Sequence, residues 1–172
     1  MNPLIDLAKQ AVEAYLKEGK IISPSADLPE EFSNSKAGVF VTIENHGNLR
    51  GCIGTYLPIR ENIAQEIIYN AIAAATEDYR FSPIEKDELL ELSFTVYILN
   101  PPELVKDIKK LDPKKYGIII RSGLKSGLLL PDLEGVETIE KQISITCQKA
   151  GINLEREKKE ITIYKFTVEK YE

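Results

Sequence analysis

The chain has 172 residues, of which 43% are hydrophobic and 28% are charged, as in an ordinary globular protein. Its 22 basic and 27 acidic residues give a net charge of −5, which argues against a nucleic-acid partner because phosphate-binding surfaces are usually basic. The two cysteines lie far apart, and no segment resembles a secretion signal or reaches the roughly 20 apolar residues of a membrane span. We therefore expect one cytoplasmic domain over residues 1–172 that needs no metal or cofactor to fold.

The first half of the chain predicts a helix, a β-hairpin, a second helix and a strand. Apolar residues recur at helical spacing over about residues 3–19, and the proline- and serine-rich segment 20–37 predicts an irregular connection. The elements expected after it are two strands at 39–44 and 49–54, a helix of about 15 residues from near Glu61, a loop at 78–83, a short charged helix at 84–90 and a strand at 92–99.

The turn of the predicted hairpin decides which side chains share a face. A three-residue loop, 45–47, would place Ile43 opposite Leu49, whereas a two-residue loop would place Ile43 opposite Arg50. A slip of one residue moves every side chain to the other face, so apolar pairing favours the three-residue loop. That register places Phe40, Thr42, Glu44, Arg50 and Cys52 on one side of the hairpin.

The second half repeats the same order of elements. A strand at 117–121, a turn at 122–126 and a return strand at 127–130 precede a helix at 138–150 and a last strand at 160–168. We interpret residues 38–99 and 117–168 as two degenerate repeats of a hairpin–helix–strand unit. The fold class expected is α+β, with a mostly antiparallel or mixed sheet, helices packed on it, and room for a small second lobe.

The two repeats differ in one segment that bears on chemistry. Arg50-Gly51-Cys52-Ile53-Gly54 corresponds to Ser126-Gly127-Leu128-Leu129-Leu130, so only the first repeat has a guanidinium and a thiol on one face. A guanidinium binds anions and favours a nearby thiolate, and Gly51 would allow a ligand to approach closely. Two alternatives remain open, because Cys52 could be a small buried hydrophobe and Arg50 could pair with Glu44.

Other polar residues have weaker claims to a site. Asp78 and Arg80 could form a polar rim beside Cys52, or could cap a helix and pair with each other. Cys147 lies on the apolar face of a helix and is expected in the core, while the single histidine, His46, has no second soft ligand near it and predicts no metal site. Asp107 and Asp112 interrupt the one basic cluster, which we interpret as solvated surface; its members are Lys106, Lys109, Lys110, Lys114 and Lys115.

Several of these motifs together resemble the AMMECR family, named after the human Alport, intellectual disability, midface hypoplasia and elliptocytosis chromosomal region. The most specific is Leu49-Arg50-Gly51-Cys52-Ile53-Gly54, supported by Asp78-Tyr79-Arg80-Phe81 and by Gly127-Leu128-Leu129-Leu130-Pro131. The resemblance covers about residues 4–169. The family often has proline in the place of Tyr79.

The resemblance implies a two-lobed α+β fold and a site centred on Arg50, Gly51 and Cys52. Because the family is associated in prokaryotes with Memo-like and radical S-adenosylmethionine proteins, it implies partners of those kinds. Two hypotheses follow. In the first, the protein is an enzyme or enzyme-system component acting on an unknown small polar or anionic molecule, with Cys52 as nucleophile or acid/base and Arg50, Gly51, Thr42, Glu44, Asp78 and Arg80 binding it. In the second, it is a non-catalytic binding or adaptor module.

Overall fold

The protein divides into two compact units in the computed structural model, which describes residues 2–25 and 27–172. Unit 1 runs to Leu99 and includes Glu169–Glu172, and unit 2 comprises Asn100–Val168. Each unit has a four-stranded sheet and its own hydrophobic core. The expected α+β class is confirmed.

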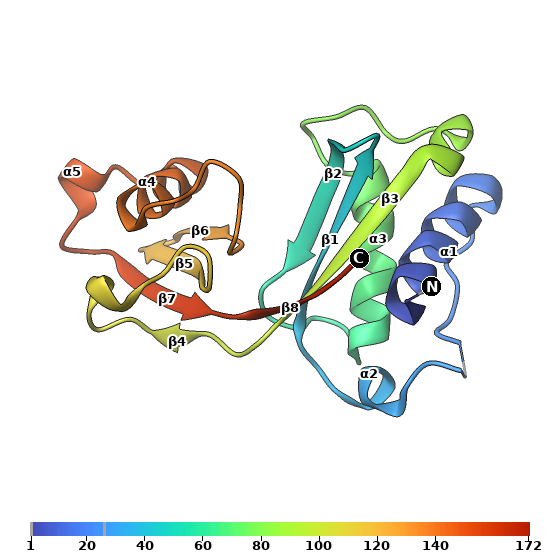
Figure 1. The fold of residues 1–172 in the computed structure, drawn as a ribbon, viewed down its shortest axis with the longest axis horizontal. Helices are drawn as coiled ribbons and strands as arrows, with labels where there is room; N and C mark the ends of the chain where they lie inside the picture. Colours follow the sequence, from blue (N-terminus) through green and yellow to red (C-terminus); the bar gives the residue numbers. More distant parts are fainter. Residues whose placement is uncertain (1, 26) are drawn as a thin grey trace. The chain divides into compact units, whose positions relative to one another are not determined.

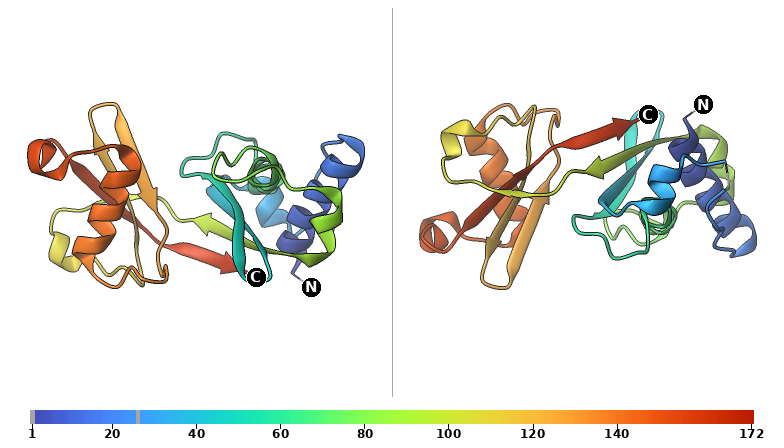
Figure 2. Two further views of the ribbon diagram at one scale, coloured as in Figure 1. Left: turned by 90° about the horizontal axis from the view of Figure 1, so that it is seen from above. Right: turned by 90° about the horizontal axis from the view of Figure 1, so that it is seen from below.

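Unit 1 is a sheet with the order β2-β1-β3-β8, covered on one face by helices (Figures 1 and 2). Its elements are α1 (Pro3–Glu18), α2 (Glu30–Asn34), β1 (Gly38–Asn45), β2 (Asn48–Thr55), α3 (Ile63–Thr76), the 3-10 helix η1 (Lys86–Glu91), β3 (Leu92–Leu99) and β8 (Val168–Tyr171). Asn2 caps the start of α1, and Gly19 ends it with a left-handed φ of 67°. The short helix α2 lies within the segment that the sequence predicts as irregular.

The β1–β2 hairpin differs from its prediction. Its loop has two residues, His46 and Gly47, and the register shifts by one residue where Glu44 faces Leu49 and Ile43 faces Gly51. Arg50 is therefore the extra residue of a β-bulge, and the predicted three-residue loop is wrong. The bulge restores the pairing of apolar side chains, because Val41 then faces Ile53. The bulge inside β2 thus keeps apolar side chains opposite one another, which the three-residue loop was expected to do.

Unit 2 has the sheet order β4-β7-β5-β6. Its elements are β4 (Glu103–Leu104), the 3-10 helix η2 (Ile108–Lys110), β5 (Gly117–Ser122), β6 (Lys125–Leu129), α4 (Ile139–Ala150), α5 (Leu154–Glu157) and β7 (Thr162–Phe166). Thr138 caps α4, and Gly151 ends it with a φ of 66°. Cys147 is 1% exposed in the core of this unit, as expected from its position on the helix.

The two sheets share one topology. In each, a hairpin leads to a helix and then to a strand that pairs antiparallel with the first strand of the hairpin. The fourth strands are exchanged: β4 follows β3 in the chain but joins the sheet of unit 2, and β8 follows β7 but joins the sheet of unit 1. The single last strand predicted at 160–168 is therefore wrong, because the chain leaves one sheet after Phe166 and enters the other at Val168.

Candidate functional site

Cys52 lies on β2, an edge strand, on the face of the sheet that α1 and α3 leave open. The core face carries Val39, Val41 and Ile43, each fully buried, so the alternate side chains of β1 point the other way. Thr42 is one of these; it faces Cys52 directly, and its Oγ1 donates a hydrogen bond of 3.3 Å to Cys52 Sγ. The thiol is half-buried and belongs to no disulfide.

Two further residues on this face are Thr95 and Tyr97 of β3, which β1 separates from β2. Thr95 faces Thr42, and Tyr97 faces Phe40, which in turn faces Gly54. Burial raises the pKa of Tyr97. Neither residue was expected at the site from the sequence, although the alternation of polar and apolar side chains along residues 92–99 places both on this face. The open face therefore combines a thiol with three hydroxyl groups.

Arg50 points to a different part of the unit. Its Nε donates to Glu88 Oε2 at 2.7 Å and its Nη2 to Glu88 Oε1 at 2.8 Å, while the carbonyl oxygens of Ser82 and Pro83 accept from Nη1 and Nη2. The hydrogen bond from Arg50 lowers the pKa of Glu88. Four hydrogen bonds thus use most of the donors of this guanidinium and join β2 to the segment before β3. The partner considered from the sequence, Glu44, instead lies opposite Leu49.

Asp78 and Arg80 occupy the outer edge of β2 at Cys52. Asp78 Oδ2 accepts a hydrogen bond of 2.9 Å from the Cys52 backbone N–H, and Arg80 Nη2 donates one of 3.4 Å to the Cys52 carbonyl. The two side chains also pair with each other, through Nη2 and Oδ2 at 2.6 Å and Nε and Oδ1 at 2.9 Å. They satisfy at one residue the backbone groups that a neighbouring strand would satisfy.

The Asp78–Arg80 pair brings a guanidinium to Cys52. The hydrogen bond from Arg80 lowers the pKa of Asp78 to about 2, and the Cys52 N–H acts in the same direction. Asp78 raises the pKa of Arg80, and a Cys52 thiolate would raise it further, so the two charges are within electrostatic reach. The Arg80 side chain is 42% exposed, and its Nη1 donates no hydrogen bond to any residue that the structure describes. The sequence placed the Arg50 guanidinium on the same face as Cys52, whereas the guanidinium that contacts Cys52 in the structure is that of Arg80.

Gly51 and Gly54 have packing partners within the unit. A Cβ on Gly51 would lie 2.0 Å from the Ala74 carbonyl oxygen of α3, and a Cβ on Gly54 would lie 2.3 Å from Cγ of Phe40. Gly127 of β6 is in the corresponding position, since its Cβ would lie 2.5 Å from the Thr146 carbonyl oxygen of α4. A glycine therefore lets each return strand approach its helix, which explains Gly51 without a ligand.

The single histidine lies in the hairpin turn and not at Cys52. His46 is in the hairpin turn, with a φ of 49° and its Nε2 3.4 Å from Glu91 Oε2. Among residues 2–25 and 27–172, no three His, Cys, Asp or Glu side chains are grouped as metal ligands, and no helix is long and apolar enough to cross a membrane.

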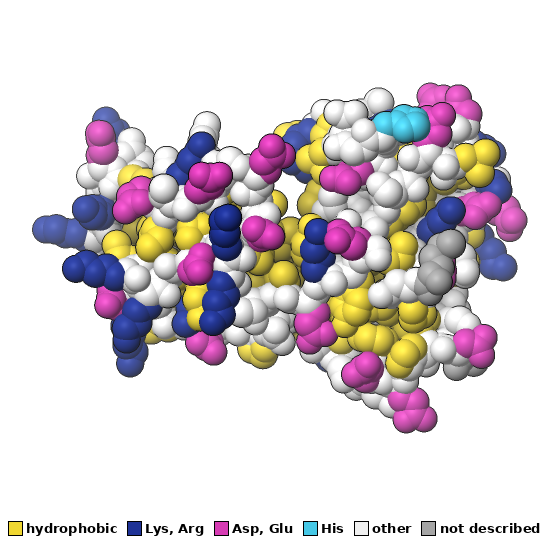
Figure 3. All heavy atoms as spheres, in the orientation of Figure 1, with side chains coloured by type: hydrophobic (Ala, Val, Ile, Leu, Met, Phe, Trp, Pro, Cys, Tyr) yellow, Lys and Arg dark blue, Asp and Glu magenta, His cyan; other side chains and the backbone are white. Residues whose placement is uncertain are grey.

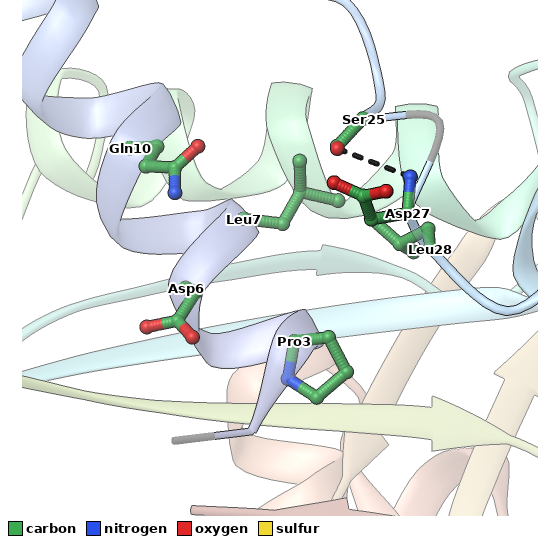
Figure 4. A pocket seen from close by; sticks show the side chains of 7 residues that line it. All are labelled: Pro3, Asp6, Leu7, Gln10, Ser25, Asp27 and Leu28. Carbon is green, nitrogen blue, oxygen red and sulfur yellow. Dashed lines mark hydrogen bonds between the residues drawn. The ribbon is translucent and has the colours of Figure 1, made fainter.

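Cys52 does not line any of four pockets in the described part of the chain. One of them, of about 140 Å³, lies between α1 and the segment around Leu28 (Figure 4). In this pocket the Asp27 backbone N–H donates to Ser25 Oγ.

The AMMECR1 family profile matches residues 5–171. This chain belongs to the AMMECR1 family. It is 51% identical over 171 residues to a Thermotoga maritima protein, covering 99% of this chain and 97% of that one. It is 45% identical to protein CA_C1420 of Clostridium acetobutylicum, covering 99% of this chain but only 36% of that longer protein.

A solved AMMECR1-like structure has the same fold. The crystal structure of the uncharacterised protein PH0010 of Pyrococcus horikoshii matches with a TM-score of 0.91 and 37% identity, covering 97% of this chain and 88% of that one. These relatives carry no named activity or substrate, so the AMMECR1 match establishes family and fold, and function must be argued from the site.

Proposed function

We propose that this AMMECR1-family protein is an enzyme, or a component of a small enzyme system, that acts on a small polar or anionic molecule at the open sheet face around Cys52. The observation that supports this best is the environment of the sulfur. A hydroxyl donates to Cys52 Sγ, and the Arg80 guanidinium lies within electrostatic reach. Both features favour the thiolate, which is the nucleophilic form of cysteine.

The roles follow from the contacts. Cys52 is the nucleophile or acid/base, and Thr42 orients its sulfur. Arg80 holds the anionic group of the substrate through Nη1, while Asp78 fixes the guanidinium and the strand at once. Arg50 supports the site by holding the segment that follows Asp78 and Arg80 against β2. Gly51 and Glu44 have no direct role in this proposal.

Alkylation kinetics test the proposal, and Cys147 is an internal control because burial raises the pKa of its thiol. We expect iodoacetamide to modify Cys52 in the folded protein between about pH 6 and pH 9 while Cys147 stays unmodified. Arg80→Gln and Thr42→Val should each shift the pH dependence of Cys52 modification upward, and Lys36→Gln, a matched loss of one exposed positive charge, should not. A Cys52 that resists alkylation over this range, or three variants with identical profiles, would contradict a reactive thiolate.

A second candidate function is that of an adaptor module that docks a protein partner, such as a Memo-like or radical S-adenosylmethionine protein. One observation favours it: Tyr79 is 95% exposed although its neighbours Asp78 and Arg80 are held against β2. Exposed tyrosines are common anchors of protein interfaces. Binding to the purified partner that is lost on Tyr79→Ala and retained on Cys52→Ala would favour docking, and the reverse pattern would favour chemistry.

A further inference from the structure

Unit 2 is the more basic part of the chain. It has 13 Lys and Arg against 10 Asp and Glu, whereas unit 1 has nine against 17. Lys and Arg side chains are correspondingly prominent over unit 2, at the left of the face shown in Figure 3. The net charge of the whole chain therefore conceals a unit that can attract anions.

Lys165 of β7 has an ammonium group with unused hydrogen-bonding capacity. It follows Ile163 on the core face and lies opposite Ile118, and its side chain is only 25% exposed. Its Nζ lies 4.4 Å from the centroid of the Tyr116 ring and 3.8 Å from Glu103 Oε2. Within the described part of the chain, this Nζ donates no hydrogen bond. Its packing therefore holds a cation in place without satisfying its three N–H groups.

Lys165 lines a pocket of about 200 Å³ beside β4 and η2. Two further lysines, Lys106 and Lys110, line the same pocket, and Val105 and the buried Leu111 supply apolar surface. The pocket lining therefore combines three lysines with apolar surface, which suits a small organic anion. The volume is below the roughly 300 Å³ at which pockets for drug-sized ligands begin, so the ligand must be a small metabolite.

The two carboxylates in the pocket leave room for such an anion. Asp107 caps η2, where its Oδ1 accepts a hydrogen bond of 3.0 Å from the Lys109 backbone N–H. Glu103 is 74% exposed, and its contact with Lys165 is loose, so its side chain can turn into solvent when an anion arrives. Its backbone pairing with Lys165 in the sheet does not depend on the carboxylate.

We propose that this pocket binds a small phosphate monoester, with the phosphate held by Lys106, Lys110 and Lys165. Lysine ammonium groups bind phosphate as point charges. Three of them match the two negative charges of a phosphate monoester better than the one negative charge of a carboxylate ligand. The basic cluster predicted as solvated surface would then include two ligand-binding residues, Lys106 and Lys110. The cation that completes the site, Lys165, comes from a distant strand. This proposal is independent of the chemistry at Cys52.

Titration with glycerol 3-phosphate at constant ionic strength, followed by ³¹P NMR line broadening on the full-length protein, tests the proposal. We expect saturable binding, weakened about tenfold or more by Lys110→Gln and by Lys165→Gln. Glu103→Gln should strengthen binding, because it removes the carboxylate that competes for Lys165. Lys109→Gln is the matched control, since it removes the same charge from the same short helix but does not line the pocket.

The variants make the outcomes distinguishable. Lys110 is exposed, so Lys110→Gln should fold normally even if Lys165→Gln does not. Absence of saturable binding, an equal loss in Lys109→Gln and Lys110→Gln, or weaker binding by Glu103→Gln would each overturn the proposal. An equal loss in Lys110→Gln and in its control Lys109→Gln would show only nonspecific attraction of the phosphate to a basic surface.

Discussion

Gly51→Ala separates the two explanations of the glycine beside Cys52. If Gly51 exists so that a ligand can approach, the variant should fold with normal stability and lose reactivity or binding. If Gly51 exists so that β2 can lie against α3, the variant should be unstable whether or not a ligand is present. Gly51 follows the bulge at Arg50 but does not have a positive φ, so alanine itself fits the local conformation and the whole cost is steric.

The size of the clash sets the expected loss. A Cβ at this position would lie 2.0 Å from the Ala74 carbonyl oxygen. Cβ atoms in proteins essentially never come within 3.0 Å of such an atom, so strand and helix must separate by about 1 Å. Both atoms involved are attached to packed backbone and cannot rotate away. Overpacking of this kind costs roughly 1–3 kcal/mol, and we expect the upper end, about 3 kcal/mol. In a protein of this size that lowers Tm by about 6–12 °C.

Thermal and urea unfolding followed by circular dichroism measure the effect. The matched control is Gly127→Ala, whose Cβ would lie 2.5 Å from the Thr146 carbonyl oxygen in the corresponding place of unit 2. Because that clash is smaller, its loss of stability should be smaller. A Gly51→Ala protein within about 0.5 kcal/mol of the natural protein would refute the packing explanation. If its Cys52 alkylation were altered at the same time, the ligand explanation would replace it.

Three further predictions concern charged groups. The pKa of Asp78 is lowered from 3.8 to about 2, so the ionised carboxylate adds about 2 kcal/mol to the free energy of unfolding above about pH 4. This contribution is lost as the pH falls to about 2, and the pH dependence of unfolding of Asp78→Asn should lack it. Arg50→Lys should lose about 1–3 kcal/mol in urea unfolding, nearly as much as Arg50→Ala, since lysine cannot reproduce the two-point contact with Glu88; full stability of Arg50→Lys would contradict this. Glu66 is 1% exposed and accepts hydrogen bonds from the Ile59 and Arg60 backbone N–H groups. Glu66→Ala should therefore lower the free energy of unfolding by about 3 kcal/mol, and a loss below about 1 kcal/mol in urea unfolding would show that water replaces the carboxylate.

Features encoded within a few residues were predicted well from the sequence. The strand at 92–99 has the bounds expected from its alternation, and Gly19 and Gly151 end helices at the expected places. Family membership was also recognisable, because the string around Cys52 is specific. The length of the turn was not predicted correctly. A two-residue loop combined with a bulge pairs the apolar side chains as well as a three-residue loop does, and the bulge at Arg50 leaves no mark in the sequence pattern.

The candidate site shows the same division. Alternation alone places Cys52 and Thr42 on one face of the hairpin, because side-chain direction in a strand depends only on neighbouring residues. Which guanidinium reaches the sulfur depends on contacts between distant segments. Arg50 joins Glu88, 38 residues further along the chain, and Asp78 and Arg80 return to the edge of β2 at a separation of 26 and 28 residues. The exchange of β4 and β8 between the sheets is equally non-local. Local periodicity carries no information about which unpaired backbone groups a folded edge strand presents, or which side chains satisfy them.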